Sequence, residues 1–364
     1  MNSFFTNLQE NLLFSAELKY GQPIYTIKEA WPIPFNTDIE KLKSVITNII
    51  ASSDALRFSY FYDFQDNCLK KKISLTDPIW TSENLSFDMT DNLLFVAGIY
   101  EELGIKYLKL QFHHSLLDGW SVSKVIEKIS ALYNNQDVNP ALEYSICDHP
   151  ARLPSNKKFI ETYVPFLKDS HEDFSCTGKI IRIQGKELDN IMEYARLNKA
   201  SLFSTLIYRI IDSFKFPYHL DSIDFAIPFA ARAASNLEKI GMFVDTQLLS
   251  LDKKNIDDIS PSAVQNLLLT LLKTPKSLSN YHNTPRIMLN FIDLDVLKLK
   301  LNCDDDASIP CTILPDYCLF DVHIELRKAN HFLDVMIFHK KGILNISHDE
   351  FYSGINKSIM INGL

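Results

Sequence analysis

The feature that most constrains the fold is a strand, loop and helix pattern within residues 107–132. A largely apolar run ends in His113 and His114, and Asp118 and Gly119 follow after a short gap. Beyond them, apolar residues recur at the three- and four-residue spacing of one helix face, at Val122, Val125, Ile126, Ile129 and Leu132. The sequence therefore predicts a strand that delivers two histidines to a loop, and a helix that begins just after Asp118.

The rest of the chain mixes the helical and strand periods. Helical spacing predicts helices over residues 38–51, 188–197 and 202–214. Short runs rich in β-branched and aromatic residues predict strands at residues 56–62, 93–100, 107–113, 179–183, 223–227, 246–251, 287–292, 320–326 and 332–338. A stretch containing two prolines, residues 147–157, is the best linker candidate. We expect an α+β protein with antiparallel or mixed sheets, divided into residues 1–150 and 151–364.

Composition narrows the possible functions. With 364 residues, 46% of them apolar, the chain can bury more than one core, and a net charge of −8 without a basic stripe argues against nucleic acid as a partner. No apolar run is long enough to span a membrane, and the N-terminus does not look like a signal peptide. The six cysteines show no Cys-x-x-Cys spacing, so we expect reduced thiols and a cytoplasmic protein. Neither a metal-ligand cluster nor a glycine-rich phosphate loop is found.

The pattern His-His-x-x-x-Asp-Gly at residues 113–119 resembles the signature of a superfamily of acyltransferases. Its members include chloramphenicol acetyltransferases, condensation domains of nonribosomal peptide synthetases and wax ester synthases. Residues 240–247 resemble the condensation-domain motif Gly-x-Phe-Val-Asn-Thr, with Asp245 in place of asparagine. Residues 226–232 look like a family strand that ends in an arginine, and residues 53–58, 286–291 and 319–322 match more loosely. The Asp-Phe-Gly-Trp-Gly motif of the plant acyltransferases is not found, which favours the condensation branch.

This resemblance implies two chloramphenicol acetyltransferase-like lobes in a V-shaped pseudo-dimer with mixed sheets, residues 1–150 carrying the histidine motif. It implies a stand-alone condensation enzyme of natural-product biosynthesis. An acyl group would pass from a phosphopantetheine thioester on an acyl or peptidyl carrier protein to a small-molecule amine or alcohol, without a tightly bound cofactor. Two alternatives stay open: a transferase that uses coenzyme A as donor, and a condensation-like module that only recruits partners.

For the motif itself, the resemblance assigns chemistry to His114. An imidazole, which titrates near neutrality in its ordinary state, could act as a base or as a positioning acceptor for the attacking amine. The competing interpretation is a buried histidine satisfied by a backbone carbonyl. His113 should face the opposite side of the strand and have a structural role. Asp118 is a good helix N-cap, and in the family it forms a salt bridge with the arginine equivalent to Arg232, expected here in the second lobe. The amide of Gly119 could face an oxyanion, or the glycine could only permit the turn.

Four further residues are candidates near the substrate. Ser121 could cap the helix or donate to the acyl carbonyl. Trp120 is expected to belong to the core, although its place in the motif makes it a candidate for lining the tunnel. Asp245 could tune selectivity for a cationic acceptor, or it could be a tolerated surface or hydrogen-bonding change. Asn290, on a predicted strand, completes the tunnel candidates.

Overall fold

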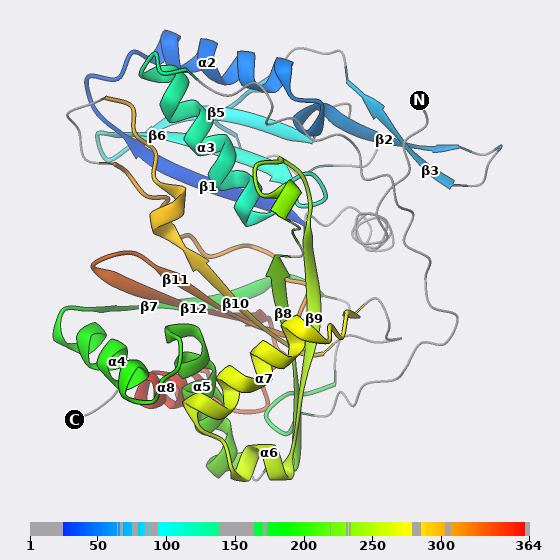
Figure 1. Cartoon of the computed structure of the whole chain (residues 1–364), viewed down its shortest axis with the longest axis vertical. Coiled ribbons are helices and arrows are strands. Elements are labelled where there is room, and N and C mark those ends of the chain that lie inside the picture. The colour runs from blue at the N-terminus through cyan, green and yellow to red at the C-terminus, as the bar shows by residue number, and fades with distance from the viewer. Residues whose placement is uncertain are drawn as a thin grey trace. The chain divides into compact units, whose positions relative to one another are not determined.

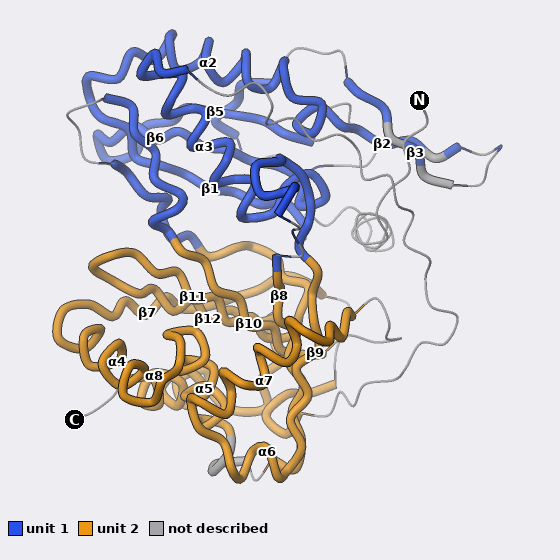
Figure 2. Tube along the Cα trace, in the orientation of Figure 1, with its two compact units in different colours: residues 1–153, 230–244, 294–313 blue, residues 154–229, 245–293, 314–364 orange. Residues whose placement is uncertain are grey.

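The computed structural model describes residues 25–63, 65, 68–74, 79–83, 87, 94–137, 164–169, 173–218, 220–230, 232, 234–278, 285–302 and 307–360. The chain forms two compact units that are discontinuous in sequence (Figure 2). Unit 1 comprises residues 1–153, 230–244 and 294–313, and unit 2 comprises residues 154–229, 245–293 and 314–364. The sequence predicts a single division near residue 150. Two later segments nevertheless pack with unit 1.

Unit 1 is built on a sheet with the strand order β1-β6-β5-β4. The strands are β1 (Thr26–Ile33), β4 (Ile79–Trp80), β5 (Phe95–Glu102) and β6 (Ile105–His113). The pairs β1/β6 and β5/β6 are antiparallel, and β4 runs parallel to β5. Helices α2 (Ile39–Ser52) and α3 (Gly119–Tyr133) lie against each other beside this sheet (Figure 1). The short helix η1 (Asp54–Arg57) leads into a hairpin of β2 (Phe58–Asp63) and β3 (Cys68–Ile73).

The strand β6 explains why the sheet of unit 1 forms. Its alternate residues Leu108, Leu110 and Phe112 are at most 1% exposed and belong to the apolar core. The intervening residues Lys109, Gln111 and His113 lie on the opposite face, because successive side chains of a strand alternate. On α3, the predicted stripe is buried from Val122 to Ile129. The expected strand and helix on either side of the histidine loop are therefore confirmed.

Unit 2 contains a six-stranded mixed sheet with the order β7-β12-β11-β10-β8-β9. The strands are β7 (Cys176–Gln184), β8 (Ser222–Ala230), β9 (Val244–Asp252), β10 (Ile287–Asp293), β11 (Val322–Lys328) and β12 (Phe332–Lys340). Strand β10 runs parallel to both β8 and β11, whereas β12 is antiparallel to β7 and β11. This arrangement confirms the α+β class with mixed sheets.

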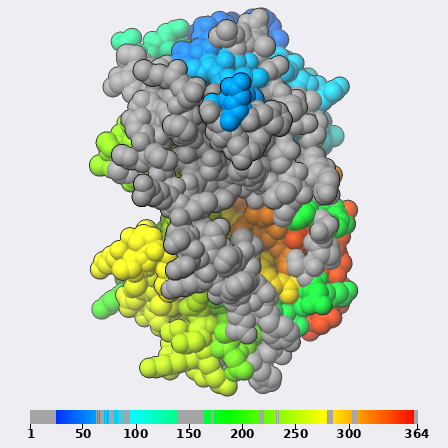
Figure 3. Space-filling model, turned by 90° about the vertical axis from the view of Figure 1, so that its right-hand side faces the viewer, coloured from blue at the N-terminus to red at the C-terminus, as the bar shows by residue number. Residues whose placement is uncertain are grey.

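Helices cover one face of the unit 2 sheet (Figure 1). They are α4 (Lys186–Leu197), α5 (Leu202–Tyr218), α6 (Lys253–Asp257), α7 (Pro261–Lys273) and α8 (His348–Ile359). The core between sheet and helices includes Ile210 of α5 and Phe351 of α8 together with Ile324 and Val335 of the strands. Leu269 and Leu272 of α7 are exposed to solvent. The part of the chain that contains α7 forms the yellow region of the surface in Figure 3.

Several expectations differ from the structure. The strand expected at residues 56–62 begins at Phe58, because residues 54–57 close a 3₁₀ turn first. The sequence patterns do not predict strand β1 or helices α7 and α8, all of which are present. The expected linker at residues 147–157 lies outside the described residues. Among the residues that are described, no helix is long and apolar enough to cross a membrane.

Candidate functional site

The histidine motif occupies the connection between β6 and α3. The backbone amide of His114 donates to the carbonyl of Tyr25 over 2.7 Å, which fixes the start of the loop beside β1. The ring nitrogen Nδ1 of His114 lies 2.9 Å from the carbonyl oxygen of Leu117. Because a carbonyl can only accept, Nδ1 carries the proton, and in the neutral ring Nε2 is left as an unprotonated acceptor. The loop thus holds the imidazole in the tautomer that can accept a proton or a hydrogen bond.

His113 is held in the opposite way. It is 4% exposed, and its Nδ1 accepts from the amide of Ser115 over 3.2 Å. The Ser115 hydroxyl lies 2.7 Å from the same nitrogen and 2.7 Å from the hydroxyl of Tyr60. The Ser115 hydroxyl therefore donates to His113 Nδ1, and the Tyr60 hydroxyl donates to Ser115. Burial, with a smaller contribution from His114, lowers the pKa of His113 to about 3. His113 is therefore a neutral structural group with the tautomer opposite to that of His114.

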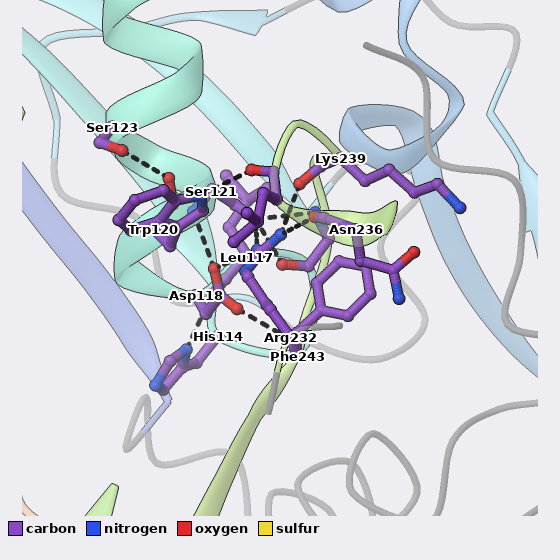
Figure 4. A network of polar contacts seen from close by, with 12 residues as sticks. His114, Leu117, Asp118, Trp120, Ser121, Ser123, Arg232, Asn236, Lys239 and Phe243 are labelled. Carbon is purple, nitrogen blue, oxygen red and sulfur yellow. Dashed lines mark hydrogen bonds and ion pairs between the residues drawn. The ribbon is translucent and has the colours of Figure 1, made fainter. Parts of the chain in front are cut away.

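Asp118 connects the loop to two other parts of unit 1. Its side chain is 0% exposed and caps α3 by accepting from the amide of Ser121 over 2.7 Å. The same oxygen accepts from Arg232, and the second oxygen accepts from the amide of Phe243 over 2.9 Å. The expected N-cap is thus present, and Asp118 also binds the segment of residues 230–244 (Figure 4).

Arg232 Nη2 and Asp118 Oδ1 form an ion pair over 2.7 Å, and the Arg232 side chain is 2% exposed. Arg232 Nη1 also donates to the carbonyls of Asn236 and Lys239, and its guanidinium lies over the ring of Phe243 at 4.1 Å (Figure 4). The resemblance implies an arginine in the second lobe. Both partners instead belong to unit 1, because the chain leaves β8 and returns to α3 before it enters β9.

Ser121 serves neither of its two expected roles. Its hydroxyl is buried, donates to the carbonyl of Gly241 over 2.6 Å and accepts from the amide of the same residue over 2.8 Å. It also accepts from Arg232 over 2.6 Å. The hydroxyl is therefore committed to holding residues 230–244 on α3, since Asp118 already supplies the cap.

Gly119 is the first residue of α3 and does not need a left-handed backbone. A Cβ built on it would meet no atom within 4 Å, which is open space as far as the described residues are concerned. Amides in the first turn of a helix lack partners within the helix and point toward the positive end of its dipole. A backbone donor beside open space suits a developing negative charge on oxygen.

The expectation that Trp120 belongs to the core is wrong, since the residue is 39% exposed. Its indole nitrogen donates to the carbonyl of Leu237 over 2.7 Å. The buried stripe of α3 faces the sheet, and the helical spacing turns position 120 away from that stripe. Trp120 packs on residues 230–244 from outside.

Asp245 and Asn290 belong to unit 2. The two oxygens of Asp245 accept from Gln247 Nε2 over 2.6 Å and from the Ser277 hydroxyl over 2.8 Å. Burial raises the pKa of this carboxyl, and the hydrogen bonds from Ser277 and Gln247 oppose the change. Asn290 on β10 donates to Glu325 on β11 over 3.1 Å. The role of both residues in lining a tunnel stays a prediction.

Sequence reasoning missed some members of the site. Leu117 and Phe243 contribute through backbone atoms, which carry no residue signal, and Ser115 orients His113 from a position that the motif leaves open. The two-residue spacing of His113 and Ser115 is a signal that could have been used. Among the described residues, no three histidine, cysteine or acidic side chains are grouped so that they could hold a metal ion.

Comparison with curated proteins finds similarity to peptide synthetases. The chain is 26% identical over 241 residues to a component of plipastatin synthase from Bacillus subtilis, covering 58% of this chain and 7% of that protein. It is 25% identical over 314 residues to N-(5-amino-5-carboxypentanoyl)-L-cysteinyl-D-valine synthase of Penicillium rubens, covering 73% of this chain and 8% of that protein. The chain thus spans less than a tenth of the length of these relatives. No family model matches it.

Solved structures share the fold over the whole chain. The first condensation domain of the calcium-dependent antibiotic synthetase, in complex with a substrate analogue, has a TM-score of 0.75 at 11% identity, covering 99% of this chain and 95% of that one. The starter condensation domain of rhizomide synthetase in complex with C8-CoA has a TM-score of 0.72 at 11% identity, with coverages of 99% and 93%. The epimerization domain from the third module of tyrocidine synthetase B has a TM-score of 0.70 at 12% identity, with coverages of 99% and 96%.

Proposed function

For a chain with the fold of nonribosomal peptide synthetase condensation domains, we propose acyl transfer from a phosphopantetheine thioester on a carrier protein to an amine or alcohol. The single observation that carries the proposal is the state of His114. Its Nδ1 is bound to the Leu117 carbonyl, so Nε2 presents a lone pair. The neighbouring His113 differs, because its Nδ1 is occupied by the donors of Ser115.

The proposed reaction begins with attack of the amine nitrogen on the thioester carbonyl carbon. The new C–N bond forms, the carbonyl oxygen takes the electron pair, and the proton of the amine moves to Nε2 of His114. The C–S bond then breaks and the proton passes to the departing thiolate. Holding the amine as a neutral nucleophile against the carbonyl is itself a large part of such a rate enhancement. His114 can contribute both by positioning the amine and by taking its proton.

Asp118 acts in this proposal as a positioning residue. It touches the amide of Ser121, the guanidinium of Arg232 and the amide of Phe243, and its side chain is fully buried. These contacts fix where α3 begins and therefore where Leu117 presents the carbonyl that orients His114. Its loss would disturb the site through geometry.

Gly119 is assigned to the oxyanion in the same proposal. The space where a Cβ would stand is open among the described residues and would admit the thioester carbonyl, and an amide at the start of α3 would donate to the oxygen as negative charge develops. A backbone donor of this kind is rigid, because the cap at Asp118 fixes the first turn of the helix.

The proposal also names the acyl donor and the cellular location of the protein. A carrier-bound phosphopantetheine thioester and a coenzyme A thioester present the same reacting group, and one neighbour in fold was solved with C8-CoA. We favour the carrier protein because the relatives in sequence are peptide synthetases. A cytoplasmic location and a stand-alone enzyme stay predictions.

The test is single-turnover transfer from a purified acyl-carrier to an amine, followed by mass spectrometry. His114→Ala should fold, still bind the acyl-carrier, and lose product formation by roughly 10²–10⁴, as expected for a positioned proton-transfer group. His331→Ala, which removes an exposed histidine in the turn between β11 and β12, is the matched control and should transfer normally. The coenzyme A thioester of the same acyl group is offered in parallel to identify the donor.

The outcomes separate the alternatives. Undiminished transfer by His114→Ala would show that the imidazole does not assist the chemistry. No transfer by the wild type, with intact carrier binding, would favour a recruitment module. Inversion of the acyl group's α-carbon without amide formation would assign the chain to the epimerising relatives of the same fold.

A further inference from the structure

Asp245 differs from three buried carboxylates of the described chain that form ion pairs with arginine. These pairs are Asp118–Arg232, Asp321–Arg286 and Asp334–Arg182. Asp245 is half-buried, and its carboxylate accepts from the neutral donors Gln247 and Ser277 and from the backbone of Thr246. Moving a carboxylate out of water costs free energy, and neutral hydrogen-bond donors without a nearby cation recover only part of that cost.

Gln247 supplies an independent observation at the same place. The residue is 4% exposed, and its Nε2 donates to Asp245. The other atom of the same amide, Oε1, is buried and has no hydrogen-bond donor among the residues that the structure describes. Exchanging the two amide atoms would turn Oε1 toward the Asp245 carboxylate, which is unfavourable because both are acceptors. The two side chains therefore offer a carboxylate and an unused carbonyl oxygen, which we call the Asp245–Gln247 site.

Both groups of this site are hydrogen-bond acceptors, and one of them is an acid, so the site suits a positively charged hydrogen-bond donor. A primary ammonium group has three N–H donors and a full charge, so one group can satisfy both the carboxylate and the amide oxygen. Burial raises the pKa of the Asp245 carboxyl, and an ammonium group in contact would oppose that shift. A neutral hydroxyl group could donate a hydrogen bond to Gln247 Oε1, but it would not neutralise the charge of the Asp245 carboxylate.

The chain itself connects this site to the Asp118 network. Asp245 follows Phe243 by two residues, and the amide of Phe243 donates to Asp118 over 2.9 Å. Two residues of extended chain span about 7 Å. The backbone therefore keeps Asp245 within two residues of a residue that contacts Asp118.

We propose that the Asp245–Gln247 site binds a primary ammonium group of the substrate that lies away from the reacting atoms. The identity of the ligand as a substrate group rests on the proposed acyl transfer. The ammonium group is not the attacking amine, which must be neutral to react. It belongs either to the acyl donor or to the amine substrate, and two pairs of probes distinguish these sources.

The experiment measures binding by calorimetry, without turnover. The donor pair is the N-acetylcysteamine thioesters of Nα-acetyl-lysine and Nα-acetyl-norleucine, and the amine pair is lysinamide and norleucinamide. In the pair that matches the natural source, the wild type should bind the lysine compound about 10- to 100-fold more tightly, the range of a charge-assisted hydrogen bond. Asp245→Asn should abolish the preference, whereas Asp221→Asn, which removes an exposed carboxylate of unit 2, should keep it.

Thermal stability provides the second readout. In Asp245→Asn the partly buried charge is removed, the remaining side-chain oxygen can still accept from Gln247 Nε2, and the new amide nitrogen can donate to the Ser277 hydroxyl oxygen. The variant should therefore melt at the same temperature as the wild type or higher. A residue kept only for stability would give the opposite result, a lower melting temperature with unchanged binding.

The two hypotheses can fail separately. A lysine preference that depends on Asp245, in a protein that transfers no acyl group, would keep the ammonium site and remove the proposed reaction. Acyl transfer without a lysine preference in either pair would overturn the ammonium site alone. A preference that survives Asp245→Asn would also overturn it.

Discussion

Replacement of Asp118 by alanine should destabilise unit 1 by about 3–5 kcal/mol, the range for removing one partner of a buried ion pair. The Arg232 side chain is 2% exposed, so its charge would remain buried next to the carbonyls of Asn236 and Lys239. The amides of Ser121 and Phe243 would lose their acceptors as well. A buried amide left without a partner costs about 1–3 kcal/mol by itself, which supports the upper part of the range.

Urea unfolding followed by tryptophan fluorescence measures this loss selectively. All three tryptophans, Trp31, Trp80 and Trp120, lie within residues 1–153 of unit 1. With a urea slope of about 2 kcal/mol per molar, the midpoint should fall by roughly 1.5–2.5 M. The control is Glu40→Ala, which removes an 84% exposed partner of Lys43 on α2 and should cost about 0–1 kcal/mol.

A double replacement identifies the cause. Arg232→Met keeps much of the side-chain volume without the charge, so Asp118→Ala combined with Arg232→Met should be less destabilised than the sum of the two single changes. If Asp118→Ala shifts the midpoint no more than Glu40→Ala, the ion pair does not hold residues 230–244 on α3. If the losses of unfolding free energy in the two single variants simply add up in the double variant, the buried charge of Arg232 is not the cause. The lost contacts to the amides of Ser121 and Phe243 would then remain as the explanation.

Three further predictions concern unit 1. The pKa of His113 falls from 6.5 to about 3 on folding, so the unfolded chain binds more protons within that interval and stability drops as the pH falls. The free energy of unfolding should fall by up to about 1.4 kcal/mol per pH unit, and this dependence should be weaker in His113→Asn. Urea midpoints measured from pH 7 to 4 test both expectations. Gly119→Ala should melt normally but transfer acyl groups poorly, because a methyl group meets only open space until substrate arrives. Gly98→Ala should instead lower the melting temperature, because its Cβ would lie 1.9 Å from the Thr81 carbonyl oxygen, and a normal melting curve would contradict the structure.

The sequence alone determined what depends on neighbours along the chain. Helical spacing located α2 and α3, the alternation of residues 107–113 located β6, and Asp118 identified the start of α3. The motif also predicted a chemical role for His114 and a structural role for His113, and the role of His114 stays a prediction. These features rest on local backbone geometry and hydrogen bonding, so a short window of residues contains the information.

Only the tertiary structure decided which distant residues meet. Residues 230–244 and 294–313 pack with unit 1, although they follow strands of unit 2. The Ser121 hydroxyl binds the Gly241 carbonyl, Trp120 is exposed rather than buried, and Asp245 meets Gln247 and Ser277 with no cation in contact among the described residues. The contacts of Ser121 and Trp120 depend on backbone carbonyls brought to α3 from more than a hundred residues away, whereas those of Asp245 join side chains 2 and 32 residues apart. Backbone groups are the same at every position, so no residue pattern could have marked them.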